Sequence, residues 1–285
     1  MSIDTGLVGK VAFISGGSRG IGLAIATRLA TEGVHVVIAA KTVEPNPRLP
    51  GTIYTAAAEI ESAGKAHNVG CLPVQADIRD EESVLAAVEA AKARFGGVDI
   101  LINNASAINL TPTSATPMKR FDLMFGVNVR GTYLCTQALL PLLTASAKAG
   151  RNPHILTLSP PLNLDAKWFA PHVAYTMAKY GMSLCVLGHA EEFRPLGIAV
   201  NALWPRTVIQ TAALQMIPGI LPEHCRTTAI MADAAALVLA QDAASPGHSG
   251  RFLIDDEVLR AHGITDLSGY SVVPGSTRLA PDLFL

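Results

Sequence analysis

A tyrosine and a lysine separated by one helical turn, Tyr175 and Lys179, are the pair in this chain best suited to acid–base chemistry. On an α-helix, residues i and i+4 lie on the same face. A phenol with its ordinary pKa of about 10 is a poor acid or base at neutral pH, but a neighbouring cation stabilises the phenolate and lowers that pKa. The pair therefore predicts a general acid and base, although ordinary half-buried helices also carry this spacing.

A glycine-rich turn at residues 15–22 is the second candidate site. It follows an apolar run typical of a buried strand and opens a helical pattern. Glycines let a backbone approach a pyrophosphate closely, and a helix N-terminus presents free N–H groups and the positive end of its dipole. The turn predicts a dinucleotide site, the alternative being a tight turn without a ligand. Its candidate contacts are Ser15, Gly16, Ser18, Arg19, Gly20, Ile21 and Gly22.

The end of the second predicted strand bears on the choice of cofactor. In NAD sites an acid at this position binds the ribose 2′-hydroxyl, whereas a cation accommodates the 2′-phosphate of NADP. Here the residue is Lys41, and Arg19 can add a second positive charge, because an arginine fork matches phosphate oxygens. NADP (NADPH) is therefore predicted in preference to NAD. A solvated loop lysine is the alternative, and Glu44 lies nearby.

Strand and helix patterns alternate along the whole chain. Strand patterns occur at 10–15, 35–40, 72–76, 98–103, 154–159, 198–203 and 251–254, and helical patterns at 20–32, 52–63, 80–95, 118–143 and 172–193. This alternation predicts a parallel sheet covered by helices on both faces, and no linker divides the chain. We expect a single α/β domain over residues 1–285, a doubly wound Rossmann-type sheet of about seven strands with a C-terminal tail at 261–285.

Composition excludes several classes of protein. The 285 residues carry 22 Lys and Arg against 23 Asp and Glu without a basic block, so nucleic acid is not an expected partner. The four cysteines lie far apart without metal-site spacing, so no metal is expected. The first ten residues lack a signal-peptide pattern, and no apolar run makes a convincing membrane span. We therefore expect a cytoplasmic protein with no membrane partner.

Four separated motifs resemble, in their order, those of the classical short-chain dehydrogenases/reductases. They are the glycine turn, Asn103-Asn104-Ala105, Ser159, and Tyr175 with Lys179. The resemblance implies that Tyr175 exchanges a proton with a carbonyl or alcohol, that Ser159 orients its oxygen, and that Lys179 lowers the Tyr175 pKa and binds the nicotinamide ribose. Asn128 matches the family's helix asparagine, which implies a water-mediated proton relay. Asp77, Asn104, Ala105 and Pro205 are further expected cofactor contacts.

The chain departs from the family pattern at Ser15, which keeps the hydroxyl of the usual threonine, and at three further places. Ser106 and Arg206 stand where the family has glycines, and Asp255-Asp256 stands where it often has Asp-Gly-Gly. Glycine at the first two positions normally lets the backbone approach the cofactor. Side chains there predict a nicotinamide pocket of different shape.

The predicted substrate is apolar. Trp168, Phe169 and Trp204 follow two strands at the carboxyl edge of the sheet, where doubly wound folds bind ligands, although these rings could equally pack the loops. The leading hypothesis is an oxidoreductase that transfers a hydride between NADP(H) and an apolar secondary alcohol or ketone, lipid-, acyl- or steroid-like.

Two other hypotheses stay open. One is a non-catalytic NADP-binding scaffold or redox sensor, and the other is a lipid-handling accessory protein. The resemblance further implies a homodimer or homotetramer formed through the helices at 118–143 and 172–193.

Overall fold

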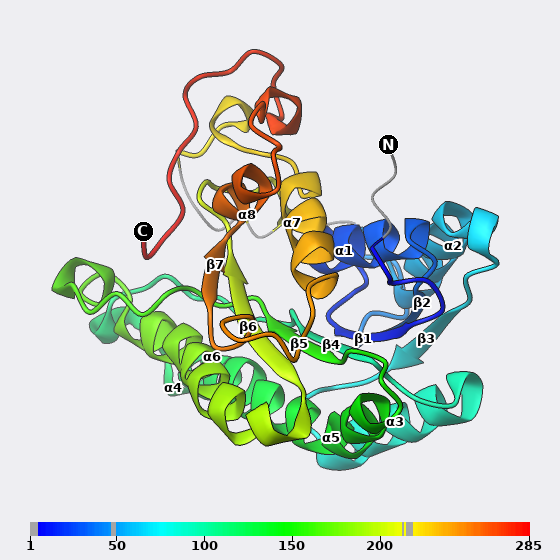
Figure 1. Cartoon of the computed structure of the whole chain (residues 1–285). Helices are drawn as coiled ribbons and strands as arrows, with labels where there is room; N and C mark the ends of the chain where they lie inside the picture. The colour runs from blue at the N-terminus through cyan, green and yellow to red at the C-terminus, as the bar shows by residue number, and fades with distance from the viewer. Residues whose placement is uncertain (1–4, 47–49, 213, 215–218) are drawn as a thin grey trace.

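A seven-stranded parallel sheet forms the centre of the protein. The computed structural model describes residues 5–46, 50–212, 214 and 219–285, and the strand order is β3-β2-β1-β4-β5-β6-β7 (Figure 1). The strands are β1 Val11–Ser15, β2 His35–Ala40, β3 Cys71–Gln75, β4 Ile100–Asn103, β5 His154–Thr157, β6 Ala199–Trp204 and β7 Phe252–Ile254. The predicted doubly wound α/β fold is confirmed. The strand order reverses between β1 and β4, where such folds bind ligands at the carboxyl ends of the strands.

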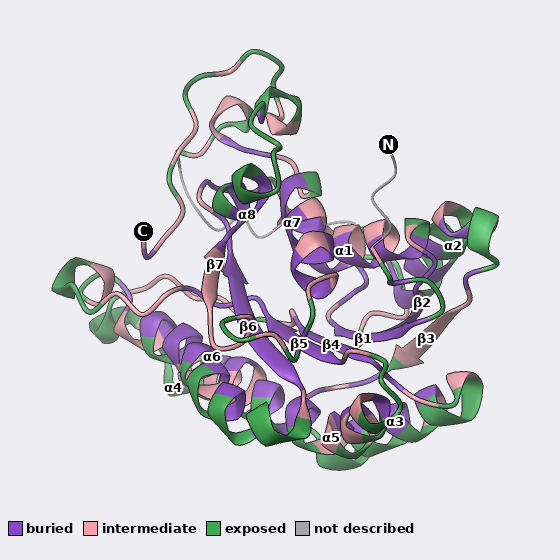
Figure 2. Cartoon of the chain, in the orientation of Figure 1, coloured by how far each residue is buried: buried purple, intermediate pink, exposed green. Residues whose placement is uncertain are grey.

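Helices cover both faces of the sheet. On one face lie α1 Gly20–Thr31, α2 Ile53–Ala63 and α7 Ala229–Leu239, with α8 Asp255–Ala261 beside α7, and on the other α3 Glu81–Phe95, α5 Thr132–Lys148 and α6 Val173–Glu192, with α4 Met118–Met124 before α5 (Figure 1). The buried residues lie between these layers, while the outer helix faces are exposed (Figure 2).

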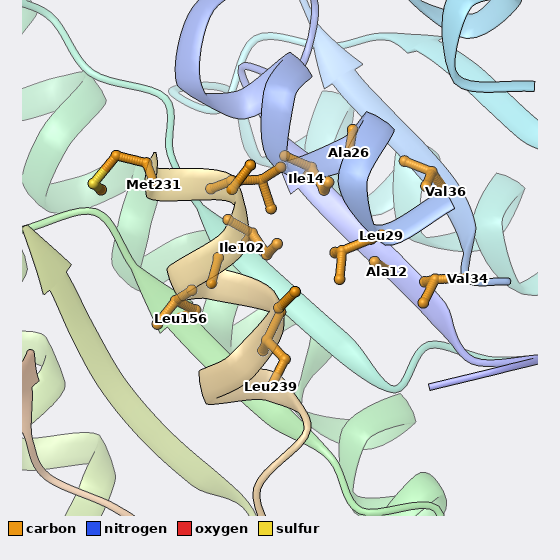
Figure 3. Packing of buried hydrophobic residues seen from close by; sticks show 14 of the residues in the cluster. Ala12, Ile14, Ala26, Leu29, Val34, Val36, Ile102, Leu156, Met231 and Leu239 are labelled. Carbon is orange, nitrogen blue, oxygen red and sulfur yellow. The ribbon is translucent and has the colours of Figure 1, made fainter. Parts of the chain in front are cut away.

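The strands are apolar throughout because each has two buried faces. Along β1, Ala12 and Ile14 join the core beneath α1 and α7, whereas Val11 and Phe13 join the core beneath α3 and α5. Side chains alternate across a strand, so both sets must be apolar. Figure 3 shows the first of these cores, with Leu29 of α1 among the side chains that pack over the sheet.

The predicted elements match the structure within about two residues, except for the helix at 118–143. That helix is interrupted by a π-helical segment, Phe125–Gly131, which separates α4 from α5. A π-turn adds a residue to the helical repeat and is frequent at functional sites, and here it surrounds Asn128. The amphipathic pattern does not reveal this extra residue.

Two helices were missing from the sequence prediction, α7 and α8. In α7 eight of eleven residues are buried, because α1, α8 and the sheet enclose it. A helix that is apolar on nearly all sides has no amphipathic stripe from which its period could be read.

The predicted loop at 41–50 is irregular where it is described, and residues 47–49 lie outside the described part. Thr52 then caps α2, because its hydroxyl accepts the Thr55 N–H and the Thr55 hydroxyl accepts the Thr52 N–H. Within the described residues, no helix combines the length and apolar character that crossing a membrane requires. No group of three or more potential metal ligands occurs in those same residues.

Candidate active site

The glycine turn between β1 and α1 is fixed by Asn104, which follows β4. The Asn104 Nδ2 donates to the carbonyl oxygens of Ser15 and Gly16, at 3.1 and 3.0 Å. In return the Ser15 hydroxyl accepts the backbone N–H groups of Asn104 and Ala105, both at 3.2 Å. A Cβ on Gly22 would lie 2.4 Å from the Asn104 Nδ2. Four of the predicted cofactor residues therefore also hold this turn in its shape.

The turn has the features of a phosphate cradle. Gly16 and Gly20 have φ values of +70° and +58°, which favour glycine. No acidic residue lies in the first turn of α1, so the dipole end is not neutralised. Ser18 is buried within the turn, and Ile21 lies half-buried at the start of the helix. These residues fit the pyrophosphate of a dinucleotide.

Two cations lie beside the end of β2. The Arg19 guanidinium donates to the Thr42 hydroxyl at 2.8 Å and to the Gly51 carbonyl at 3.1 Å. Lys41 is mostly exposed, and its Nζ lies 3.5 Å from the Asp77 carboxylate. Arg79 also binds Asp77, and its hydrogen bonds hold the pKa of that carboxyl well below the ordinary value. Asp77 thus balances part of the positive charge at this corner.

The predicted acid–base pair lies on α6, with both side chains buried, at 5% and 3% exposure for Tyr175 and Lys179. The Lys179 Nζ donates to the carbonyl of Leu158 at 2.6 Å and lies 4.8 Å from the centre of the Trp204 ring. Leu158 immediately precedes Ser159, so the lysine is tied to the end of β5. Burial lowers the pKa of Lys179 to about 7.

Ser159 carries a buried hydroxyl that has no hydrogen-bond partner among the described residues. Buried hydroxyl groups in folded proteins are almost always paired, because an unpaired one costs stability. An orphaned hydroxyl beside the anchored lysine suits a ligand oxygen.

Asn128 makes two hydrogen bonds with a single backbone residue. Its Oδ1 accepts the Ala107 N–H at 2.7 Å, and its Nδ2 donates to the Ala107 carbonyl at 3.0 Å. The π-turn thereby holds the segment that follows Asn104 and Ala105. Because one Nδ2 hydrogen and one Oδ1 lone pair are already engaged with Ala107, a proton relay through Asn128 can use only the second hydrogen and the second lone pair of the amide.

The C-terminal tail covers the acid–base pair, which the sequence analysis did not anticipate. Phe284 is fully buried, and its ring stacks on that of Tyr175 at a centroid distance of 6.2 Å and an interplanar angle of 29°. The expected lowering of the Tyr175 pKa is wrong for this closed arrangement. Burial raises the pKa, and the nearby Asp282 carboxylate raises it further.

The two residues that replace family glycines, Ser106 and Arg206, have different surroundings. Ser106 is exposed. Arg206 turns toward α8, where its guanidinium pairs with Asp256 at 2.8 Å and with Glu257. Its backbone N–H donates to the Asp255 carboxylate at 2.9 Å. The Asp-Asp pair at the end of β7 is thus the partner of the arginine that follows β6.

The structure brings the predicted catalytic residues to one edge. Ser159 follows β5, buried Pro205 follows β6, and Tyr175 and Lys179 lie on α6 beside them. The two tryptophans predicted to form an apolar face contact Phe284 of the tail, while the Phe169 ring contacts Tyr180. Sequence reasoning missed Asp282 and Phe284, which lie about a hundred residues from α6 and belong to no motif.

Comparison with known proteins gives consistent results. A model of the short chain dehydrogenase family matches residues 10–218. The chain is 56% identical over 280 residues to hydroxysteroid dehydrogenase-like protein 2 of Danio rerio, covering 98% of this chain and 64% of that protein. The curated relative is therefore considerably longer than the present chain.

Solved structures agree with the sequence comparison. A Xanthomonas campestris protein has 56% identity and a TM-score of 0.91 over 98% of both chains. A short chain dehydrogenase of Mycobacterium thermoresistibile has 52% identity and a TM-score of 0.89 over 98% of this chain and 96% of that one. More distant neighbours include a metagenomic short-chain oxidoreductase in complex with NADP, at 26% identity and a TM-score of 0.69 over 87% of this chain and 97% of that one. Another is 3-ketoacyl-(acyl-carrier-protein) reductase of Brucella melitensis with NADH, at 30% identity and a TM-score of 0.72, again over 87% and 97%. The chain belongs to the short-chain dehydrogenase/reductase family of oxidoreductases, which use nicotinamide cofactors.

Proposed function

We propose that this protein transfers a hydride between NADP(H) and an apolar secondary alcohol or ketone. The observation that carries the proposal is the buried hydroxyl of Ser159, which has no hydrogen-bond partner in the described part of the chain and lies next to the residue whose carbonyl anchors Lys179. The rings of Trp168 and Trp204 support an apolar substrate, since both lie at the carboxyl edge of the sheet and both contact the buried ring of Phe284.

The preference for NADP rests on charge at the end of β2. Arg19 and Lys41 lie there, and no acid occupies the position that binds the ribose 2′-hydroxyl in NAD sites. Arg19 already holds Thr42 and Gly51, so its guanidinium is positioned before any ligand binds. Such pre-positioning reduces the entropy lost when a phosphate binds. Gly16, Gly20, Asn104 and Pro205 would hold the remainder of the cofactor.

In the proposed reaction, a bound nicotinamide supplies or accepts the hydride. Ser159 donates a hydrogen bond to the carbonyl oxygen, and Tyr175 donates its proton to that oxygen as negative charge develops there. The buried cation of Lys179 then stabilises the phenolate that remains. Asn128 would connect Lys179 to a proton source, in addition to holding the segment at Ala107.

Turnover with NADPH and NADH on a panel of apolar ketones tests the proposal. The Tyr175→Phe change should lower kcat by about 10²- to 10⁴-fold, the usual contribution of a positioned proton donor. Tyr133→Phe is the matched control, because Tyr133 is exposed on α5, and it should leave kcat unchanged. Equal activity of wild type and Tyr175→Phe would refute the mechanism. A lower KM for NADH than for NADPH would refute the cofactor preference.

A scaffold or redox sensor remains the second candidate, supported by the burial of Tyr175 beneath the tail. It predicts tight cofactor binding without turnover on the whole panel.

Self-association is proposed for either function, because Tyr133, Leu184 and Leu187 expose 52%, 58% and 44% of their surface on α5 and α6. Light scattering that gives a monomer mass would reject it.

A further inference from the structure

The last six residues return to the carboxyl edge of the sheet from the far side of α8. The segment that follows β6 holds them by backbone hydrogen bonds. Val208 donates to the carbonyl of Ala280 at 3.0 Å, and the Asp282 N–H donates to the carbonyl of Arg206, also at 3.0 Å. Figure 1 shows the tail as a long excursion beyond α7 and α8 that ends near the loops above α6.

Phe284 is held by a group of rings that we call the aromatic cage, namely Trp168, Tyr175, Tyr180 and Trp204. Their centroids lie 5.9, 6.2, 5.3 and 6.0 Å from that of Phe284. The indole N–H of Trp204 also donates to the carbonyl of Leu283 at 2.9 Å. The cage therefore includes the proposed proton donor and binds one flat apolar group.

Phe284 has the one fully buried side chain among residues 281–285, and the rest of this segment is held by backbone hydrogen bonds. Phe284 has a φ of +77°, a backbone conformation that bulky residues rarely adopt. Its neighbours Asp282, Leu283 and Leu285 are only half-buried, and Pro281 is exposed. Withdrawal of the ring from the cage would relieve the backbone strain as well as uncover Tyr175. The contact is therefore one that a competing ligand can replace.

We propose that Phe284 occupies the place of the substrate's apolar group, so that the tail must leave the aromatic cage before a ketone reaches Tyr175 and Ser159. This inference rests on the proposed function. While the Phe284 ring stacks on Tyr175, the Tyr175 side chain is only 5% exposed. An aromatic group fits the cage because four rings surround Phe284, three of them tilted by 51–58° and that of Tyr175 stacked at 29°. Contacts between aromatic rings stabilise beyond the area that they bury.

Limited proteolysis tests the displacement without any need for turnover. Arg278 is exposed on the tail, whereas the bonds at Ala280 and Asp282 tie the chain just beyond it, so trypsin should cut the Arg278–Leu279 bond slowly. Phe284→Ala should raise that rate about tenfold. Val273→Ala, which truncates an exposed apolar side chain of the same tail, should not change it. Equal rates in the two variants would overturn the proposal.

Wild-type protein provides a test that does not depend on how the variants fold. In the presence of NADPH, acetophenone should accelerate the cut at Arg278, whereas acetone, which lacks the ring, should not. Tryptophan fluorescence reports the same event, because the only two tryptophans of the chain, Trp168 and Trp204, both contact Phe284. Fluorescence that changes with acetophenone while the cut at Arg278 stays as slow as without it would show that the ketone binds without displacing the tail, and would overturn the proposal.

Kinetics complete the test. The Phe284→Ala change removes the ring that competes with the substrate, so it should lower the KM for acetophenone about tenfold and leave kcat unchanged. The Val273→Ala control should change neither constant. A raised KM would mean that Phe284 is a wall of the pocket, and would overturn the proposal. If no variant turns over any ketone, the proposed function fails, while the proteolysis of Phe284→Ala still decides whether this ring pins the tail.

Discussion

The amino and carboxyl edges of the sheet both carry buried polar groups, yet these groups are satisfied to very different degrees. At the amino end, the Asp99 carboxylate accepts four hydrogen bonds, from the Ser146 hydroxyl at 2.6 Å, the Arg151 Nε and Nη2 at 2.8 Å each, and the Val11 N–H at 2.9 Å. His154, the first residue of β5, pairs with the Gln241 carbonyl at 2.9 Å.

At the carboxyl end, several buried groups have no such partner. Within the described part of the chain, the Ser159 hydroxyl, the Trp168 indole N–H and one oxygen of Asp255 lack a hydrogen-bond partner. Burial raises the pKa of Asp255 to about 6 and lowers that of Lys179 to about 7. Charged forms are disfavoured at this end, whereas the ion pair at the amino end keeps Asp99 ionised.

The contrast distinguishes buried polar groups that stabilise the fold from buried polar groups that serve the reaction. A satisfied buried cluster stabilises the fold, whereas unpaired buried groups cost stability and persist where they serve another purpose. Cavity size alone would mislead here. A hollow of about 640 Å³ lies beside Asp99 and Arg151, but these two charged side chains in its wall are already paired with each other. Substitutions at the amino end should therefore change stability, and those at the carboxyl end should change activity.

The largest effect is expected from Asp99→Ala. Loss of the carboxylate leaves the buried Ser146 hydroxyl and the Val11 N–H unpaired, which costs about 1–3 kcal/mol of unfolding free energy for each group. It also removes the partner of Arg151, whose side chain is 45% exposed. Urea denaturation measures this loss, with Asp122→Ala, an exposed aspartate on α4, as the control within about 0.5 kcal/mol. Turnover per folded molecule should stay within about twofold, because the cluster lies at the opposite end from the site. A folded, stable Asp99→Ala that lost its activity would break the comparison.

Acid should destabilise the amino end through His154. Burial lowers its pKa to about 4, below the ordinary value of 6.5, so the unfolded chain takes up the proton first. The contribution of neutral His154 to the free energy of unfolding is fully present above pH 6.5. It falls by roughly 3 kcal/mol as the pH drops from 6.5 to 4. The depressed pKa of Asp99 acts in the same direction. Unfolding free energies measured against pH should show a shallower decline in His154→Gln, and parallel curves would contradict this assignment.

At the carboxyl end, Lys179→Met should reduce kcat/KM about 100-fold, which corresponds to roughly 2.7 kcal/mol. The change replaces the buried Lys179, to which no carboxylate is bonded in the described residues, with an apolar side chain of similar length. The free energy of unfolding should therefore stay the same or rise. Thermal unfolding and steady-state kinetics on the same preparation separate the two effects. A large drop in melting temperature would show that this end, too, is structural.

The smallest effect is expected from Arg206→Gly, which restores the residue usual in the family. The side chain pairs with the buried Asp256 and the exposed Glu257 of α8. An exposed pair such as that with Glu257 contributes only about 0.2–1 kcal/mol. Cofactor affinity, measured by calorimetry, should change by less than about fivefold, since each 1.4 kcal/mol corresponds to tenfold. A larger gain in affinity would indicate that Arg206 obstructs the nicotinamide site despite its contacts with α8.

Local pattern was enough to predict most of the fold. Strands with two buried faces appear as continuous apolar runs, and helices with one buried face show their period, so β1 to β7 and α1, α2, α3 and α6 were all anticipated, while α4 and α5 were predicted as one helix. The π-turn around Asn128 and the enclosed helix α7 were not, because an inserted residue and a helix buried on most sides leave no periodic signal. The one continuous helix predicted at 118–143 therefore had to be corrected.

The sequence by itself determined the residue types of the site and the edge of the sheet on which they lie. The glycine turn, Ser159 and the Tyr175–Lys179 spacing are local, and parallel strands bring their carboxyl ends together whatever the details. Only the tertiary structure decided the environment of these groups. The anchoring of Lys179 to Leu158, the diversion of Arg206 to α8 and the burial of Tyr175 beneath Phe284 all join segments distant in the chain. Burial sets the direction of a pKa shift, and burial depends on which distant segments pack together.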